Sequence, residues 1–297
     1  MSAWISAARL RTLPLAASNI ILGSFLAIYY KSFNITVFIL GMITALLLQI
    51  LSNFANDYGD FKSGADEKRN STYERALQSG KISPRSMKNV IIILSVLTFL
   101  TGIALVLKGE ENMGIQGILV FIGIGFCCIF AAITYTIGKK PYGYIGLGDI
   151  AVLIFFGLIG VCGIFYLHAH TLYLGVILPA ISLGLFSTGV LNVNNIRDIE
   201  SDRTSGKNTL VVRLGISYAR NYHAFLLILG IVLSIVASVI EYHNWMQFIY
   251  LITVPFFIRN IYVVYSSSTA VLFDKELRNL ALTTFFFSLI FGISLLF

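Results

Sequence analysis

Two clusters of aspartate and asparagine stand out in a chain that is otherwise apolar. The first lies in NFANDYGDFKSGAD and holds Asn53, Asn56, Asp57, Asp60 and Asp66. The second lies in NNIRDIESD and holds Asn194, Asn195, Asp198 and Asp202. Carboxylate and amide oxygens are hard ligands that suit Mg²⁺, an ion that keeps several waters and is often shared with substrate phosphates. The clusters therefore predict a Mg²⁺ site that binds a diphosphate.

The spacing within each cluster places its oxygen ligands on one helix face. Residues four apart lie about 6 Å apart along a helix axis and share a face. Asn194, Asp198 and Asp202 are therefore predicted to form one polar column, and the first cluster can form a second column that ends at Asp60. Aspartates gathered in this way repel one another unless a cation joins them, which favours a metal site. The alternative is a pair of ordinary solvated helix ends with weak surface ion pairs.

Basic side chains near the clusters are candidates for binding the oxygens of a diphosphate. We consider Lys139, Arg203 and Lys207, with Lys acting as a point charge and Arg as a planar fork. Arg11 is a candidate for binding a substrate carboxylate or the diphosphate, and equally an interfacial anchor. Each of them could instead be one of the basic residues that set the topology of a membrane protein.

The elements that position these side chains are predicted to be membrane-spanning helices. Of the 297 residues, 57% are hydrophobic and 12% are charged, and the mean hydropathy is +0.84, which places the chain outside the soluble globular class. Apolar runs long enough to cross a bilayer are expected to be helical, because lipid offers no hydrogen-bond partner to an open backbone. Nine such runs lie near 12–30, 35–57, 87–107, 114–137, 146–167, 171–195, 221–240, 245–265 and 279–296.

The basic residues predict how these spans are oriented. All but Lys31, Lys108 and Arg259 of the 21 Lys and Arg residues fall in the N-terminal tail or in connections that follow even-numbered spans. By the positive-inside rule the N-terminus and these connections are cytoplasmic, and an odd number of spans puts the C-terminus on the opposite side of the cell membrane. The two clusters follow spans 2 and 6, so they meet at the cytoplasmic face. The net charge of +7 reflects this topology, and we expect no nucleic-acid partner.

The clusters carry a resemblance to the UbiA superfamily of intramembrane prenyltransferases, whose two Asp-rich motifs read NDxxDxxxD and DxxxD. Asn56, Asp57 and Asp60 match the start of the first motif. Asp198 and Asp202 match the second.

One position departs from the family pattern and one further motif agrees with it. Gly64 stands in place of the last Asp of the first motif, and Asp66, two residues later, is the next carboxylate. A third family element, YxxxK, is matched by Tyr135 and Lys139.

Within the superfamily the chain most resembles the MenA-type 1,4-dihydroxy-2-naphthoate polyprenyltransferases of menaquinone synthesis. The stretches that carry this resemblance are RTLPLA (11–16), NFANDYGDFKSGAD, PYGYIGLGD (141–149) and VNNIRDIESDRTSGKNTLVVRLG (193–215). The resemblance implies an all-α fold with nine transmembrane helices around a central cavity. It implies a single domain over 1–297, with cytoplasmic Asp-rich loops near 53–88 and 194–220. The implied reaction moves a polyprenyl chain from its diphosphate to 1,4-dihydroxy-2-naphthoate, with loss of the ring carboxylate, to give demethylmenaquinol.

Taken with the spacing, the resemblance assigns roles to individual residues. Bound Mg²⁺ would neutralise the leaving diphosphate and help to form an allylic cation in a shielded pocket. The residues assigned as metal ligands are Asn56, Asp57, Asp60, Asp66, Asp198 and Asp202. Those assigned to substrate binding are Arg11, Asn53, Asn56, Lys139, Asp149, Asn194, Asn195, Arg203 and Lys207. Catalysis is assigned to the four matching aspartates with Tyr135 and Lys139, and Asp149 could orient the acceptor or take its ring proton.

Three other functions stay open at this point. A UbiA-type enzyme with another acceptor, such as 4-hydroxybenzoate, homogentisate or haem, would carry the same Asp motifs. An ion-coupled transporter also has carboxylates in the membrane, but near the midplane at broken helices rather than at helix ends on one face. A purely structural membrane scaffold would not need two acidic columns.

Overall fold

The chain folds into a bundle of long helices. The computed structural model describes residues 3–64, 76–109 and 113–297, and these residues form helices and no strand. Within them, nine helical runs are long and apolar enough to cross a membrane, which confirms the predicted number. The runs are Ala3–Tyr29, Ile35–Lys62, Pro84–Lys108, Gly114–Thr134, Gly148–Ala169, Leu174–Arg197, Ile216–Ile240, Trp245–Ser266 and Ala270–Ser294.

Several of these runs consist of more than one helical segment. The first comprises α1 (Ala3–Ala7), η1 (Leu10–Thr12) and α2 (Leu13–Tyr29), and it is followed by α3 (Ile35–Lys62), α4 (Pro84–Lys108) and α5 (Gly114–Thr134). After the short η2 (Tyr142–Ile145), the fifth run comprises α6 (Gly148–Val152), the π-helical η3 (Leu153–Gly163) and α7 (Ile164–Ala169). The rest are α8 (Leu174–Arg197), α9 (Ile199–Thr204), α10 (Leu210–Leu214), α11 (Ile216–Ile240), η4 (Trp245–Thr253), α12 (Val254–Ser266) and α13 (Ala270–Ser294).

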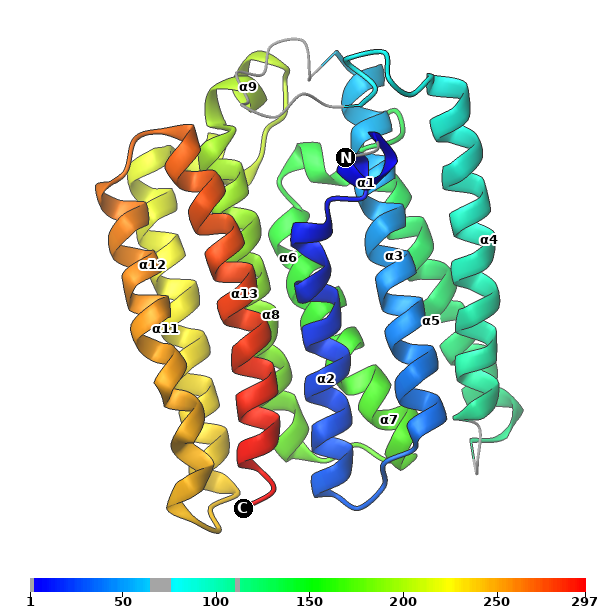
Figure 1. Ribbon diagram of the computed structural model, residues 1–297, viewed down its shortest axis with the longest axis vertical. Coiled ribbons are helices and arrows are strands. Elements are labelled where there is room, and N and C mark those ends of the chain that lie inside the picture. The colour runs from blue at the N-terminus through cyan, green and yellow to red at the C-terminus, as the bar shows by residue number, and fades with distance from the viewer. Residues whose placement is uncertain (1–2, 65–75, 110–112) are drawn as a thin grey trace.

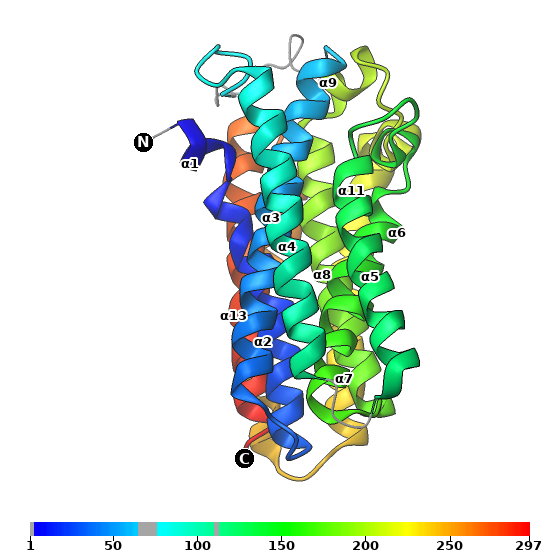
Figure 2. The ribbon, with the colours of Figure 1, turned by 90° about the vertical axis from the view of Figure 1, so that its right-hand side faces the viewer.

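The helices run roughly along the long axis of the molecule (Figure 1). Figure 2 shows, as Figure 1 does, that α1 and α9 lie at one end of the bundle and the C-terminus at the other. The end of α3 lies at the same end as α9, so the two aspartate clusters meet there, as the sequence predicts. We call this end the aspartate end and define it by Asp57, Asp60, Asp198 and Asp202.

Helices α3 and α13 extend past their predicted apolar spans into charged segments. α3 continues to Lys62 and therefore carries Asp57 and Asp60 on one continuous helix. α13 begins at Ala270 rather than near 279, so it includes charged residues that hydropathy excludes. The two carboxylates among them, Asp274 and Glu276, have partners on other elements, and Lys275 and Arg278 are exposed. The buried Glu276, for example, accepts a hydrogen bond from Asn260 of α12 at 2.9 Å.

The second cluster does not lie on one continuous helix, contrary to the prediction. α8 ends at Arg197, Asp198 has φ −98° and ψ 7°, and α9 begins at Ile199. The backbone N–H of Asp202 still donates to the Asp198 carbonyl at 2.8 Å, which keeps one helical turn across the break. Asp198 and Asp202 therefore remain one turn apart, although the helix is interrupted between them.

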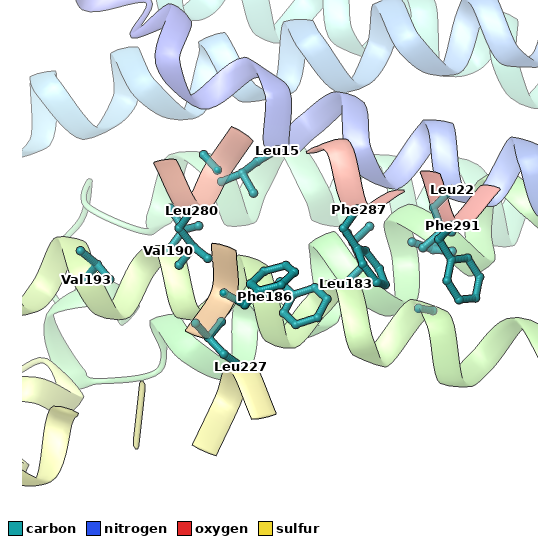
Figure 3. Close-up of a cluster of buried hydrophobic side chains, with 14 of the residues drawn as sticks. Leu15, Leu22, Leu183, Phe186, Val190, Val193, Leu227, Leu280, Phe287 and Phe291 are labelled. Atoms are coloured by element: carbon teal, nitrogen blue, oxygen red, sulfur yellow. The ribbon is translucent and has the colours of Figure 1, made fainter. Parts of the chain in front are cut away.

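A buried hydrophobic cluster joins the C-terminal helices to the first one (Figure 3). Phe186 of α8 stacks on Phe257 of α12 with ring centroids 4.2 Å apart, and it meets Phe287 of α13 edge-on at 4.9 Å. Leu22 of α2 belongs to the same cluster. Because lipid is as apolar as these side chains, close packing rather than exclusion of water stabilises such contacts in a membrane. The packing fixes α2 and α8 as two walls of the cavity described next.

Candidate functional site

A cavity of about 640 Å³ lies inside the bundle, among α2, α3, α4, α5, η3 and α8. At the aspartate end its lining is polar and includes Arg9, Arg11, Asn53, Asn56 and Asn194. Further down the lining is mostly apolar, and it reaches Leu167 and Leu172 near the opposite end of the bundle. A long apolar cavity with polar groups at one end suits a hydrocarbon chain with a charged head group.

The first motif lies on the last turns of α3, where both of its aspartates are buried. Asp57 is 2% exposed and accepts a hydrogen bond from the guanidinium of Arg9, in the N-terminal segment between α1 and η1. Asp60 accepts from the hydroxyl of Tyr144 at 2.8 Å and from the ammonium of Lys207 at 2.5 Å. Each carboxylate thus has a cation from a different part of the chain, which offsets the cost of burying it.

Lys207 connects the two motifs. Besides Asp60, its Nζ atom lies 3.9 Å from Oδ1 of Asp202 and 4.7 Å from the ring centre of Tyr144. The aromatic face adds a cation–π contact to the ion pair. A cation in this position interacts with carboxylates from both motifs at once.

The second motif is organised around Arg197, the last residue of α8. The Arg197 guanidinium donates to both oxygens of Asp198 at 2.7 and 2.8 Å, in the bidentate arrangement that suits a planar fork. It also donates to Oδ1 of Asn194 at 2.7 Å and to Asp274 of α13 at 2.5 Å. Arg11 reaches the same Asp274 oxygen at 3.3 Å. Asp274 therefore ties Arg11, which lines the cavity, and Arg197 of α8 to the last helix.

The four aspartates are neutralised by basic side chains rather than gathered into a preformed cage. Across residues 3–64, 76–109 and 113–297, no three His, Cys, Asp or Glu side chains are grouped closely enough to hold a metal ion. Mg²⁺ does not require such a cage, because one or two carboxylates with waters and phosphate oxygens complete its octahedral shell. The hard oxygen donors and the cation position shared by Asp60 and Asp202 fit this ion.

Tyr135 directly follows α5 and lines the cavity. Its ring meets that of Tyr142 edge-on with centroids 5.3 Å apart. Burial, followed by the charge of Asp149, raises the pKa of Tyr135 above its ordinary value, so the phenol stays protonated at neutral pH. It can donate a hydrogen bond or present its aromatic face to a cation. Lys139, the other residue of YxxxK, is exposed on the following loop.

Asn53 and Asn56 both line the cavity, and each also holds a neighbouring segment in place. The Asn53 amide donates to the Ala8 carbonyl at 2.8 Å and to the Thr12 hydroxyl at 2.9 Å, which fastens the N-terminal segment to α3. Oδ1 of Asn56 accepts from the Thr136 hydroxyl at 3.3 Å. The asparagines thereby help to position Arg9 above Asp57 and Tyr135 at the cavity wall.

The other residues assigned from the sequence lie further from the cavity or outside the described part of the chain. Asp149 is buried at the start of α6; the Tyr222 hydroxyl hydrogen-bonds to it, and its Oδ1 has no partner among the described residues. Asn195 is buried, and neither it nor Asp149 is among the described residues that line the cavity. Arg203 is 55% exposed and pairs with the exposed Glu200 at 3.3 Å. Asp66, assigned as a metal ligand, lies outside the described residues.

Four residues of the site were not identified from the sequence. They are Arg9, Tyr144, Arg197 and Asp274. Arg9 counted only as a topology charge, and Arg197 lies off the Asn194–Asp198–Asp202 column, although a long guanidinium reaches back to it. Asp274 fell between two predicted spans. Asp274 and Arg278 are four residues apart and have opposite charges, a spacing that favours a helix. Hydropathy alone misses this, because the segment contains four charged residues.

Sequence comparison places this geometry among known proteins. Residues 17–294 match the UbiA prenyltransferase family. The 1,4-dihydroxy-2-naphthoate octaprenyltransferase of Haemophilus influenzae is 40% identical over 295 residues, which make up 99% of this chain and 95% of that protein. The protein of the same name from Escherichia coli is 47% identical over 257 residues, 86% of this chain and 83% of that protein.

Structural comparison agrees with the sequence comparison on the fold. The structure of a UbiA homolog from Archaeoglobus fulgidus bound to GPP and Mg²⁺ is similar with a TM-score of 0.64 at 13% identity. The match covers 95% of this chain and 98% of that one. It confirms the expected UbiA-like arrangement of transmembrane helices.

Proposed function

Because this chain belongs to the UbiA prenyltransferase family, we propose that it transfers a polyprenyl chain from a polyprenyl diphosphate to 1,4-dihydroxy-2-naphthoate, with Mg²⁺ as cofactor. The product is demethylmenaquinol. The acceptor is suggested by the names of the relatives, and the metal by the homolog bound to GPP and Mg²⁺. The observation that carries the proposal is that two buried Asp motifs meet at the polar end of an apolar cavity of about 640 Å³.

The diphosphate binds at the aspartate end in this proposal. Asp57, Asp60, Asp198 and Asp202 would hold Mg²⁺, with the Asn56 carbonyl as a further oxygen donor. The bound ion would supply positive charge that offsets the charge of the leaving diphosphate. With the carboxylates turned to the ion, Arg9, Arg197 and Lys207 would be released from their ion pairs and would bind the phosphate oxygens. The exposed Arg203 lies outside the proposed site.

The reaction breaks the bond between the allylic carbon and the diphosphate oxygen, and the electron pair leaves with the diphosphate. The apolar cavity wall keeps water away from the resulting cation, and the rings of Tyr135 and Tyr142 can stabilise it. The ring carbon that carries the carboxylate attacks and a carbon–carbon bond forms to the prenyl chain. The bond from that carbon to the carboxylate then breaks, CO₂ leaves, and the electron pair of the broken bond stays with the ring and restores its aromaticity. No ring proton is removed in this step, so Asp149 is not required as a base.

The membrane arrangement of the proposal follows the basic residues. The helices form a single transmembrane domain with the N-terminus and the aspartate end at the cytoplasmic face and the C-terminus on the other side. Each substrate can then enter the site from the phase in which it dissolves. The acceptor enters from the cytoplasm and the prenyl chain from the lipid. The carboxylate of the acceptor would be attracted by Arg11 at the cavity.

Turnover by the purified protein tests the proposal. With Mg²⁺, octaprenyl diphosphate and 1,4-dihydroxy-2-naphthoate, we expect formation of demethylmenaquinol and CO₂, measured by chromatography and mass spectrometry. EDTA should abolish the reaction and added Mg²⁺ should restore it. Turnover with 4-hydroxybenzoate but not with the naphthoate would reject the acceptor and keep the family chemistry.

Substitution of the motif aspartates tests the site. Asp202→Asn and Asp60→Asn should lower kcat by at least about a hundredfold, since each removes a charge that holds the metal. Glu200→Gln is the matched control, because Glu200 lies two residues from Asp202 but is 77% exposed and outside the site. Normal turnover in both aspartate variants would show that the motifs do not bind the metal.

A further inference from the structure

Five described glycines line the cavity, and three of them, from three different helices, have open space where a side chain would begin. Gly102 lies on α4, Gly125 on α5 and Gly163 at the end of η3. A Cβ atom built on Gly125 or Gly163 would meet no heavy atom within 4 Å, and one on Gly102 would meet only Thr44, at 3.9 Å. Each position therefore has room for a larger side chain that the sequence does not use.

The periodicity of α5 shows where such a side chain would point. Among the cavity-lining residues are Phe121, Gly125, Cys128 and Ala132, which follow the spacing of one helix face. Gly125 lies in the middle of this face. Gly123 is exposed and is not among the described lining residues. A side chain at position 125 would enter the cavity, and one at position 123 would face the lipid.

Gly125 and Gly163 lie at nearly the same depth in the cavity. Phe121 of α5 stacks on Tyr166 of α7 with ring centroids 5.3 Å apart, so these two residues lie side by side. Both glycines lie nearer the aspartate end than this pair of rings. Gly125 is about one helical turn from Phe121, and Gly163 is a little less than one turn from Tyr166. At roughly 1.5 Å of rise per residue, the two glycines differ in depth by only a few ångströms.

Gly102 belongs to the same level. Gly109, just after α4, lies against α7, because a Cβ atom built on it would be 2.8 Å from the carbonyl oxygen of Leu167. Gly102 lies seven residues before Gly109, about 10 Å nearer the aspartate end, and Gly163 lies four residues before Leu167, about 6 Å nearer that end. We call Gly102, Gly125 and Gly163 the glycine level.

The glycine level divides the cavity into an upper and a lower part. Gly125 is ten residues from Tyr135, or about 15 Å at helical rise. The lining continues past the glycines to Leu167 and Leu172. A diphosphate held at the aspartate end can therefore place a short prenyl chain wholly in the upper part, whereas a long chain must pass between the glycines.

We propose that the open glycine level is what allows this protein to accept a long prenyl chain, an inference that rests on the proposed prenyl transfer. The three missing side chains form the passage by which a long polyprenyl chain reaches the lower part of the cavity. A bulky residue at any of these positions closes the passage and converts the enzyme to short-chain substrates.

The test compares two donors in the full-length purified protein, with Mg²⁺ and 1,4-dihydroxy-2-naphthoate as acceptor. The measured quantity is kcat/KM for octaprenyl diphosphate divided by kcat/KM for geranyl diphosphate. Gly125→Leu and Gly163→Leu should lower this ratio by on the order of a hundredfold or more, since each CH₂ group that loses burial costs roughly fourfold in affinity. Gly102→Leu is a third, independent variant at the same level.

Gly123→Leu is the matched control. Gly123 lies on α5, as Gly125 does, and the substitution introduces the same good helix former. Any general effect of leucine on α5 is therefore common to Gly123→Leu and Gly125→Leu. Its ratio should equal that of the wild-type protein. Turnover of geranyl diphosphate by each variant reports that the protein is folded.

The outcomes separate the two proposals. A wild-type protein that turns over neither donor would contradict the prenyl transfer itself, and with it the role of the glycines. A wild-type protein that uses both donors, with an unchanged ratio in Gly125→Leu and Gly163→Leu, would overturn the glycine proposal alone. The long chain would then leave the bundle above the glycine level.

Discussion

Lys207 is one of three basic residues in the connection between α8 and α11, and its contacts distinguish it from the other two, Arg203 and Arg213. It interacts with Asp60 and Asp202, where a metal ion is proposed to bind. Lys207→Gln should therefore weaken prenyl diphosphate binding about 10- to 100-fold, through the loss of a charge-assisted hydrogen bond to phosphate. It should also let Mn²⁺ bind more tightly in the absence of diphosphate, because a competing cation has gone.

Steady-state kinetics and a Mn²⁺ titration followed by electron paramagnetic resonance measure these two effects. Arg203→Gln is the control, since Arg203 lies in the same connection but is 55% exposed and pairs with Glu200. Equal losses in both variants would mean that the overall charge of the connection matters, and not the position of Lys207.

Tyr135 allows a prediction about pH. Burial raises its pKa above the ordinary value of about 10, so the hydroxyl stays protonated at every pH below that value. The pH profile of kcat should accordingly show no limb due to Tyr135 up to about pH 10, and Tyr135→Phe should have the same alkaline profile. An alkaline limb near neutral pH that disappears in Tyr135→Phe would show that the residue acts as a base.

At the residue scale, the sequence predicts which carboxylates meet but not what holds them. The fourfold spacing and the shared side of the membrane bring Asp60 and Asp202 within reach of one cation. Arg197 lies off the Asn194–Asp198–Asp202 column by its Cα position, and only the reach of its long side chain brings its guanidinium to Asp198 and Asn194. Nothing in the sequence distinguishes Tyr144 from the other aromatic residues, and its role follows only from the contact of its hydroxyl with Asp60.

At the scale of elements, α13 contributes to the site through Asp274. This carboxylate accepts from Arg197 and Arg11, so it shares the Arg197 guanidinium with Asp198 and competes with it for that charge. Asp274→Asn should leave Arg197 paired with Asp198 alone and lower the affinity for Mn²⁺ about tenfold, with a similar fall in kcat/KM. Lys275→Gln, a change at the exposed neighbouring residue, should have no such effect. Unchanged Mn²⁺ affinity in Asp274→Asn would contradict this role.

The nine spans could be predicted from the sequence because each one needs its own run of apolar residues. Their ends could not, since tertiary partners decide where charged turns remain helical. α3 continues through Asp57 and Asp60, and both are paired with cations. The break in the helix at Asp198 could not be predicted either. The spacing of Asn194, Asp198 and Asp202 fits a continuous helix and an interrupted one equally well.

At the scale of the whole molecule, the orientation in the membrane can be tested directly. Lys140 and Thr171 are exposed and lie on either side of span 5, at opposite ends of the bundle. In a variant whose native cysteines are replaced by alanine, Thr171→Cys should react with a membrane-impermeant thiol reagent added to intact cells. Lys140→Cys should react only after the membrane is opened. The reverse pattern would invert the proposed topology and place the aspartate end outside.

The depth and width of the cavity are properties of the whole molecule that no local pattern contains. Gly102, Gly125 and Gly163 are far apart in the sequence and belong to three helices, so their common level follows only from how those helices pack. Taken alone, each glycine cannot be distinguished in the sequence from the small residues that are common in membrane helices.

The widened helix η3 limits how this chain can change in evolution. Its i→i+5 hydrogen bonds fit more residues into a given height than an α-helix does, and Phe155, Ile159 and Gly163 line the cavity along it. Deleting one residue could be absorbed by a return to α-helical turns, but everything after the deletion would rotate. Gly163 would then turn away from the cavity and a different side chain would take its place. Insertions and deletions among natural relatives should therefore avoid 153–163 and gather in the connecting loops, where a change in length leaves the register of the wall intact.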